Sequence, residues 1–439
     1  MKISRFTRGI KNVLSDYSAN VKAFSINARL YLASVILVGA ALGIYRLLFN
    51  FYVLSLGYNE TLLGTLITTS SLTALLAAVP MGYLVDRIGH KRALIISALA
   101  LSAAIVVMIL LPSAATFIAM NVIVGFAQSL TGVTMGPFLM ENSSEKERTY
   151  LFSFTSGLNM TSAFVGNWVG GYLPTWMADW VSSTPTSSSA YGASLAVIST
   201  TVVVSIVPLL WLRRTHLPAS ERSAFAPLSY FASHKKLLTR LILPMMITSI
   251  GAGLIMPFLN VFYRNVFHQP DPVIGSMFAW GSLAMGVGLL IAPPLADRYG
   301  KIQIVVITQA LSIPFLFIMG FSPWFAFSAA AYYIRLTLMN MSLPVYQTFV
   351  MERVERGARA TVASLVSMAN NLGWAFSPTI SGWLQVNYGF SPAYAATIVL
   401  YVLSIYLYWR YFWKREKKLT DEKAETGGVT FPAASHPRE

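Results

Sequence analysis

Cysteine is absent from this 439-residue chain, and charge is scarce, because only 11% of the residues are Asp, Glu, Lys or Arg. Without cysteine there are no disulfide bonds, thiolate metal ligands or cysteine nucleophiles. Soluble domains carry roughly 25% charged residues. With 55% hydrophobic residues, this chain has too little polar surface to cover its apolar content in water. A lipid bilayer as the main solvent removes that conflict, so the composition predicts a polytopic membrane protein.

Signatures of catalysis and of cofactor binding are also missing. We find no Ser-His-Asp arrangement, no cluster with metal-ligand spacing and no phosphate-binding loop, so we expect neither an enzyme nor a bound cofactor or metal. The formal net charge of +15 would favour a nucleic-acid ligand in a soluble protein. Here the basic residues lie between apolar runs, which is the pattern that orients membrane proteins, so we expect no nucleic-acid partner.

Long apolar runs separated by short polar loops predict transmembrane helices, because lipid cannot satisfy an exposed backbone. We expect an all-α fold with twelve of them, at 29–56, 60–84, 92–112, 114–139, 149–174, 191–213, 237–263, 272–295, 302–321, 324–350, 360–386 and 392–413. Residues 1–28 are predicted to form an amphipathic arm on the membrane surface, or a partly ordered tail. Segment 214–236 is expected to link two six-helix halves, 29–213 and 237–413, and residues 414–439 to be a disordered tail.

The distribution of positive charge predicts the orientation. Of the 32 Lys and Arg residues, 29 lie in the two terminal segments or in loops on the same side of the membrane. Positive loops face the cytoplasm, so both termini are expected there, in the cytoplasmic membrane of a bacterium or archaeon. The other three basic residues are Arg46, Arg264 and Arg335. Arg264 lies near a span end, and we expect its side chain to extend toward the membrane interface.

The two halves of the chain align with each other at an offset of 211 residues. The alignment pairs Gly64 with Gly275, Asp86 with Asp297, Arg87 with Arg298, Gly89 with Gly300, Glu141 with Glu352 and Gly171 with Gly382. The matches fall at corresponding loops and helix ends, which chance similarity between apolar helices would not produce. Two parallel six-helix repeats predict a two-bundle transporter with its substrate site between the bundles near the bilayer midplane.

The loop after the second span carries a family resemblance. It reads Gly82-Tyr-Leu-Val-Asp86-Arg87-Ile-Gly89-His-Lys91-Arg92, and a partial copy at 294–301 follows the eighth span. This motif resembles the signature loop of the major facilitator superfamily, and the similarity covers residues 29–413. The resemblance implies a secondary active or facilitative transporter whose two bundles rock to give alternating access.

The same resemblance implies a latch that holds one conformation. Its residues would be Gly82, Asp86, Arg87, Gly89, Lys91, Arg92, Glu141, Asp297, Arg298, Gly300 and Glu352. A glycine lets two helices meet in a tight turn, and an arginine can bridge to a nearby carboxylate. We expect Glu141 to belong to the first-half charge cluster and Glu352 to pair with Arg298. The alternative is that these charges only fix the orientation, since interfacial ion pairs are often worth little.

Arg46 and Arg335 fall within the first and tenth predicted spans, where no Asp, Glu or His lies mid-span to pair with them. Inserting an arginine costs roughly 2.5–3.5 kcal/mol on translocon scales. A water-filled cavity or an anionic ligand would compensate that charge, and arginine suits carboxylate or phosphate. We therefore expect a small organic anion bound between the bundles by both arginines. The alternative is that they bond to backbone carbonyls or stack on Tyr45, Tyr332 or Tyr333.

Other polar side chains within the spans complete the expected substrate site. They are Tyr45, Asn50, Gln128, Asn159, Asn260, Gln309, Tyr332, Asn340, Gln347 and Asn370. Such side chains bind ligands or hydrogen-bond helices to one another. The competing function is efflux of amphipathic, drug-like or lipid-like compounds, which suits the abundance of aromatic residues and Met. A non-transporting receptor is the remote alternative. The expected partners are the lipid bilayer and a small solute, and we expect a monomer.

Overall fold

The computed structural model describes residues 24–213, 234–354 and 359–413, and within these ranges its regular structure is helical. Most of the predicted surface arm, most of the linker and the predicted tail lie outside the described residues. The extents of those three segments therefore stay predictions.

The first half contains α2 (Ile26–Ser55), α3 (Glu60–Ile88), α4 (His90–Leu110), α5 (Ala114–Glu141), α6 (Glu145–Trp180), α7 (Ser188–Val204) and α8 (Ile206–Leu210). The second half contains α10 (Lys235–Ile255), the 3-10 turn η1 (Met256–Phe258), α11 (Leu259–Phe267), α12 (Asp271–Tyr299), α13 (Lys301–Phe321), α14 (Phe325–Glu352), α15 (Arg359–Tyr388), α16 (Ser391–Tyr408) and the π-helical η3 (Trp409–Trp413). Joining α7 to α8, α10 to α11 and α16 to η3 gives twelve rods in the described ranges. The largest difference from the predicted spans is at α6, which is longer at both ends.

Nine of the twelve described rods are long and apolar enough to cross a membrane by length and composition. The other three are α6, α14 and α15, and the sequences of α6 and α15 are rich in Ser, Thr, Asn and Gly. Helices α6 and α15 pack against the opposite half of the molecule, on α12 and α3. A helix that faces protein along much of its surface needs fewer lipid-compatible side chains, so their lower hydropathy fits their position.

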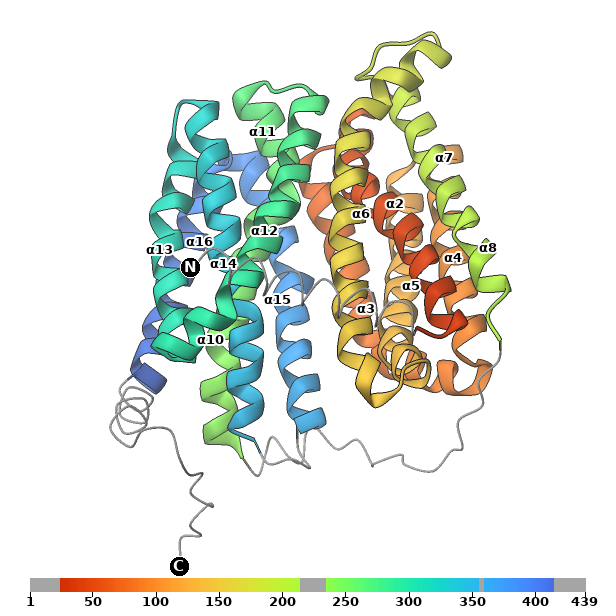
Figure 1. Cartoon of the computed structure of the whole chain (residues 1–439). Helices are drawn as coiled ribbons and strands as arrows, with labels where there is room; N and C mark the ends of the chain where they lie inside the picture. The colour runs from red at the N-terminus through yellow and green to blue at the C-terminus, as the bar shows by residue number, and fades with distance from the viewer. Residues whose placement is uncertain (1–23, 214–233, 355–358, 414–439) are drawn as a thin grey trace, which may run out of the picture.

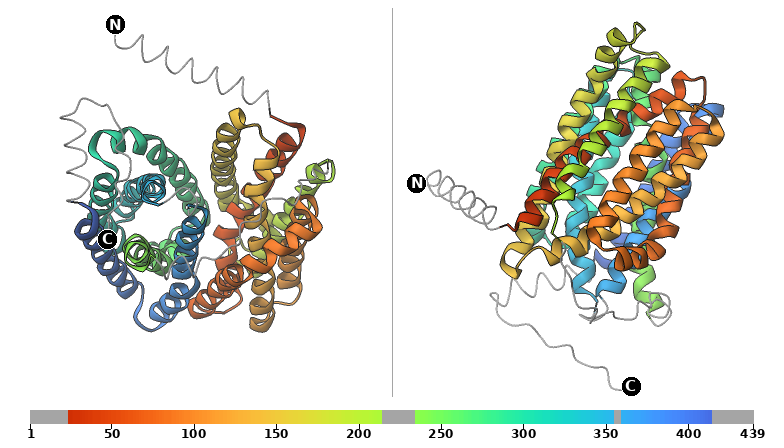
Figure 2. Two further views of the ribbon diagram at one scale, coloured as in Figure 1. Left: turned by 90° about the horizontal axis from the view of Figure 1, so that it is seen from below. Right: turned by 90° about the vertical axis from the view of Figure 1, so that its right-hand side faces the viewer.

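The rods form two bundles side by side, drawn in Figure 1 from red to yellow-green for the first half and from green to blue for the second. Figure 2 shows the same division from below. The bundles meet mainly along two helix pairs, α3 with α15 and α6 with α12. Helices α2 and α10 pack inside their own bundles, α2 on α6 and α7, α10 on α15 and α16.

Helix α2 begins and η3 ends on the lower side in Figure 1, which we call the terminal side; the opposite side is the distal side. On the terminal side, α3 turns into α4 at Gly89 and α12 turns into α13 at Gly300. Both glycines have positive φ, 82° and 93°, a conformation that other residues rarely adopt. The repeat in the sequence thus corresponds to a repeat in backbone geometry.

Candidate functional site

Glycines let the two bundles touch on the distal side. A Cβ added to Gly275 of α12 would lie 2.6 Å from the carbonyl oxygen of Asn167 and 2.7 Å from Cα of Gly171, both on α6. Gly64 of α3 likewise lies directly against the backbone of Pro378 in α15. Because the obstructing atoms are backbone, a side chain at these positions would force the helices apart.

Two asparagines hydrogen-bond the bundles to each other next to this contact. Asn50 of α2 donates to Oδ1 of Asn260 in α11 (3.0 Å) and to the carbonyl oxygen of Pro257 (2.8 Å). Asn260 donates in return to the carbonyl oxygen of Leu47 (2.8 Å). Proline interrupts a helix because it lacks an amide hydrogen, and Pro257 lies in the η1 turn between α10 and α11. Both asparagines were predicted as substrate residues, and in this conformation they bond to each other.

A partly buried charge cluster completes the distal contact. Asp271, the first residue of α12, accepts a hydrogen bond from the hydroxyl of Tyr191 in α7 (2.7 Å) and forms an ion pair with Arg264 of α11. The Arg264 guanidinium also donates to the Tyr191 hydroxyl and lies 3.4 Å from the ring centroid of Phe51 in α2. Arg264 therefore inserts between side chains of the first bundle. The expectation that it extends to the membrane interface was wrong, because a carboxylate seven residues further along the chain pairs with it.

We call the contacts of Asn50, Asn260, Tyr191, Arg264 and Asp271 the distal seal. The sequence flagged the two asparagines but missed the other three. Asp271 directly precedes the eighth predicted span and Tyr191 begins the sixth, so neither counted as a polar residue in the middle of a span. The available signal was an acid and an arginine that flank one short distal loop.

On the terminal side the bundles lie apart. Added Cβ atoms at five glycines in the terminal halves of their helices would meet nothing within 4 Å; these are Gly82, Gly132, Gly136, Gly157 and Gly286. The hydrogen bonds that join the bundles, such as Thr379 to Thr68 and Thr61 to the carbonyl of Gly382, come from the distal parts of α3 and α15. The arrangement is closed on the distal side and open on the terminal side.

We infer from the helix periodicity that Arg46 faces this opening. It lies one helical turn before Asn50, and residues four apart share a helix face, so its side chain projects on the face that meets the second bundle. Asn50 and its neighbours are buried, whereas Arg46 is exposed. Earlier in the same helix, Gly39 and Gly43 pack on α6. Arg46 thus lies just on the terminal side of the distal seal, at the closed end of the opening.

Arg335 has a different environment. It is only 1% exposed and lies in the core of the second bundle. One guanidinium nitrogen donates to the hydroxyl of Tyr401 (3.1 Å), and its carbon lies 5.5 Å from the centre of that ring. In this conformation Arg335 does not line the space between the bundles, so it does not share a site with Arg46.

The other predicted substrate residues fall into two groups, one exposed like Arg46 and one packed in a bundle like Arg335. Gln128, Asn159 and Gln347 are exposed, and Asn159 lies beside Gly39 of α2. The remaining residues make contacts inside one bundle. Gln309 donates a hydrogen bond to Ser342, Asn340 donates to the carbonyl oxygen of Leu336, and the carbonyl oxygen of Asn370 accepts from Ser249. The ring of Tyr45 stacks on Phe49, and the ring of Tyr332 is buried beside Tyr263.

The carboxylates of the predicted latch contact the starts of the next helices. Glu141 lies 2.6 Å from Nε2 of His90, and Glu352 forms an ion pair with Lys301. Positions 90 and 301 are repeat equivalents, as are 141 and 352, so the same contact occurs once in each bundle. The expected partner of Glu352 was Arg298, whose guanidinium instead lies over the ring of Tyr299.

The remaining latch residues make contacts within the first bundle or point outward. Lys91 donates to the carbonyl oxygens of Leu210 (2.5 Å) and Leu212 (2.9 Å), which ties α4 to the end of α8. Arg87 and Arg92 are exposed. The side chains of Asp86 and Asp297 are not among those described. Among the described latch contacts, each stays inside one bundle, which agrees with the opening on this side.

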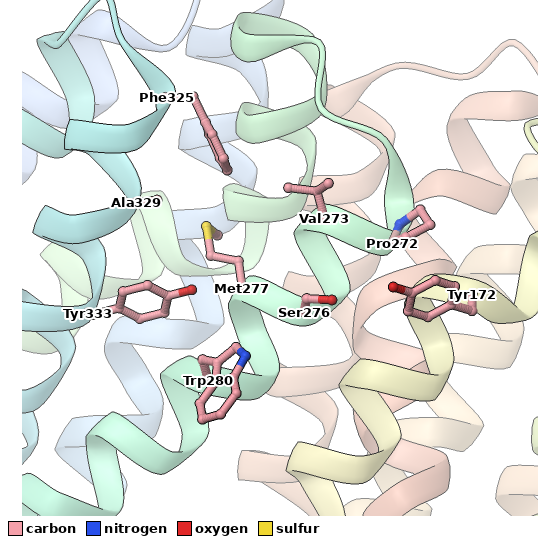
Figure 3. A pocket seen from close by; sticks show the side chains of 9 residues that line it. All are labelled: Tyr172, Pro272, Val273, Ser276, Met277, Trp280, Phe325, Ala329 and Tyr333. Carbon is pink, nitrogen blue, oxygen red and sulfur yellow. The ribbon is translucent and has the colours of Figure 1, made fainter.

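A separate aromatic pocket of about 290 Å³ lies where α6, α12 and α14 meet in their distal halves. Figure 3 shows its nine lining residues, with Tyr333 of α14 and Tyr172 of α6 on opposite sides and Trp280 of α12 between them. Tyr172 continues a row of exposed aromatic residues on α6 with Trp168 and Trp176. The lining carries no charged residue and suits the aromatic part of an uncharged or amphipathic molecule.

Comparison with known proteins gives the family. A family model described as Major Facilitator Superfamily matches residues 31–248 and 241–437. Proteins named multidrug resistance protein MdtG match nearly end to end. The one from Proteus mirabilis is 23% identical over 406 residues, covering 87% of this chain and 94% of the relative. The one from Enterobacter lignolyticus is 24% identical over 388 residues, covering 83% and 87%.

Solved structures agree in fold. The nucleoside transporter NupG superimposes with a TM-score of 0.71 at 14% identity, covering 88% of this chain and 98% of that one. A bacterial homologue of the human lysosomal transporter Spinster, in an inward-facing and occupied conformation, gives a TM-score of 0.72 at 13% identity, covering 89% and 96%. At such identities these likenesses concern the fold alone.

Proposed function

The chain belongs to the major facilitator superfamily and is a membrane transporter of that kind, and from this premise we propose that it exports amphipathic, drug-like compounds by alternating access. The preferred compounds are neutral or carry one anionic group. The multidrug resistance name of the full-length relatives supports export of this class. The expectation of a small organic anion held by two arginines has less support, because it needs both charges at one site.

The burial of Arg335 is the observation that carries this proposal. With Arg335 enclosed in its bundle, Arg46 is the one of these two arginines that is exposed. A single arginine can attract one anionic group but cannot enclose a small di-anion by itself. An amphipathic molecule can instead place a large apolar part against the walls and its polar group near Arg46.

We place the terminal side in the cytoplasm, because the positively charged loops and terminal segments lie there. The described conformation is then inward-facing, with the distal seal closing the outer side. This orientation supports uptake of compounds from the cytoplasm or the inner leaflet. The relatives come from enterobacteria, so we assign the protein to a bacterial inner membrane.

Replacement of Arg46 should separate substrates by charge. In proteoliposomes, we expect Arg46→Gln to slow transport of an anionic amphipathic dye about 10-fold or more, since a hydrogen bond to a charged group is worth roughly 1.5–3 kcal/mol. Transport of a neutral dye of similar size should change less than about 3-fold, because it does not use the charge. Fluorescence of both dyes measures the two rates in one preparation.

Arg240→Gln is the matched control, because Arg240 lies at the terminal end of α10 against the ring of Tyr411 rather than at the opening. This substitution should leave the transport rates of both dyes unchanged. Equal loss of both dyes in Arg46→Gln would contradict the assigned role. Robust transport of a small dicarboxylate, with no transport of either dye, would favour the small-anion alternative.

A further inference from the structure

Among the charged residues whose side chains the structure describes, Arg335 is the least exposed, at 1%. Its Nε and Nη1 atoms are buried and make no hydrogen bond to the described part of the protein. The ion pairs among the described residues involve other cations, namely His90, Arg264 and Lys301. A buried cation without a counter-charge is among the most costly features a protein can hold. Something with negative charge is therefore expected beside it.

Tyrosines from three elements surround this guanidinium. The guanidinium carbon lies 5.5 Å from the ring centre of Tyr401, and Tyr394 lies two helical turns before Tyr401 on the same side of α16. The rings of Tyr263 and Tyr332 pack on each other in the same buried cluster. The Tyr401 hydroxyl accepts from Arg335, and the Tyr263 hydroxyl is bonded to Ser328. The Tyr394 hydroxyl is buried and has no partner in the described protein. Two nitrogen donors of Arg335 and the hydroxyl donor of Tyr394 are thus buried without a partner in the core of the same bundle.

Three glycines on neighbouring helices make room for these rings. A Cβ at Gly320 of α13 would collide with the ring of Tyr394, one at Gly251 of α10 with the ring of Tyr401, and one at Gly281 of α12 with the hydroxyl of Tyr332. Each ring occupies space that the side chain of any residue larger than glycine would fill at these three positions. The packing therefore brings the hydroxyl groups in around the arginine.

The first bundle shows that the fold does not require this cluster. At the repeat offset of 211, the equivalent of Arg335 is Val124, which is 2% exposed in the apolar core of the first half. The offset does not extend to the sixth helix of each half, because α7 begins at Ser188 and α16 at Ser391, so it gives no equivalents for Tyr394 and Tyr401. An ordinary apolar core serves at the same place in the same architecture. A charged centre in only one of the two bundles indicates a function beyond packing.

We propose that Arg335, together with the hydroxyl of Tyr394, binds a small inorganic anion such as chloride inside the second bundle. The two free nitrogens and the hydroxyl supply charge-assisted hydrogen bonds to the ion. The ligand must be small, because Arg335, Tyr263, Tyr394 and Tyr401 are each no more than 2% exposed. A transported compound that enters between the bundles does not reach this place in the described conformation. This anion site is independent of the proposed export function.

Thermal unfolding of the full-length protein in nanodiscs tests this proposal. Chloride replaces gluconate at constant ionic strength, and no transported solute is present. A ligand that binds only the folded state raises Tm by mass action, so we expect a saturable rise of about 4 °C at a chloride concentration 100-fold above Kd. Bromide should act like chloride, and gluconate, which is too large to be enclosed, should have no effect.

Three variants assign the effect to residues. Arg335→Gln should abolish the chloride dependence, and Tyr394→Phe, which keeps the arginine and the ring, should weaken the apparent affinity for chloride at least several-fold. Arg240→Gln, which changes an arginine at the terminal end of α10 against the ring of Tyr411, is the control and should respond like the wild type. If Arg335→Gln does not fold, Tyr394→Phe decides alone. A wild-type Tm that is indifferent to halide, or an unchanged response in Tyr394→Phe, would overturn the proposal and leave the cluster satisfied by water.

Bromide also gives a direct image. Anomalous scattering from crystals grown in bromide should show a peak within hydrogen-bond distance of the Arg335 guanidinium. Absence of that peak at a bromide concentration that saturates the Tm response would place the halide elsewhere and refute this site. Neither measurement depends on transport, so either can fail while the proposed export function stands.

Discussion

Replacing Asp271 with asparagine should shift the protein toward the conformation that is open on the distal side. The substitution removes the negative charge that pairs with Arg264 and accepts a hydrogen bond from Tyr191. The Arg264 charge then lies against the ring of Phe51 in the first bundle without that ion pair. Because the Arg264 side chain is 22% exposed, water screens this ion pair and weakens it relative to a fully buried one. We therefore expect the substitution to destabilise the distally closed conformation by about 1–2 kcal/mol. That corresponds to a change of about 5- to 30-fold in the ratio of the two conformations.

Distance measurements between spin labels would report this shift. The chain has no cysteine, so Asp179→Cys in the first bundle and Trp324→Cys in the second give uniquely labelled, exposed distal positions. With Asp271 in place, the distance between the two labels should be mainly short. In Asp271→Asn, a second population with a longer label-to-label distance should appear. The control is Glu60→Gln, which removes a second distal carboxylate that touches Asn265 across the bundles at an exposed position. It should change the distribution little, and an equal effect of both variants would contradict a special role for Asp271.

Enlarging Gly275 to alanine should reduce transport more than 10-fold, although the change adds one methyl group. The new Cβ would overlap backbone atoms of Asn167 and Gly171, which cannot move aside as a flexible side chain could. The bundles would then be unable to close on the distal side. Since alternating access needs both closed forms, the cycle would stall. The initial rate of dye transport, corrected for the amount of folded protein, measures this effect.

Gly286→Ala is the matched control on the same helix. Its added Cβ would meet nothing within 4 Å, so no contact with the first bundle is disturbed. Alanine also favours helix by roughly 0.8–1.0 kcal/mol relative to glycine, so the variant should be at least as stable as the wild type. Wild-type transport by Gly275→Ala would show that the two helices do not need this close approach.

The twelve rods could be predicted because each carries its own signal, an apolar run bounded by polar loops. The repeat of 211 residues gave the two-bundle architecture for the same reason, since matched residues such as Asp86 and Asp297 need no knowledge of packing. The ends of α6 were placed less well, because its polar first turn and aromatic last turns extend beyond the apolar run.

The site was harder to predict, because it depends on which face of each helix meets which neighbour. Arg46 and Arg335 look alike in sequence, as lone arginines in apolar spans. One lies on the face shared with Asn50, and the other points into a core that three glycines open for tyrosine rings. The distal seal was missed because Tyr191 and Asp271 are 80 residues apart and come from different bundles. The contact of His90 with Glu141 could not be predicted either, because these residues are 51 positions apart and lie on different helices.

Accessibility of a single cysteine at position 46 tests the central claim most directly. In the cysteine-free chain, Arg46→Cys is treated with a membrane-impermeant thiol reagent, in right-side-out and in inverted membrane vesicles. We expect modification only from the side that carries the termini, while Arg335→Cys reacts from neither side. Modification of Arg46→Cys only from the distal side, or its protection from both sides as in a lipid-facing residue, would contradict the crevice described here.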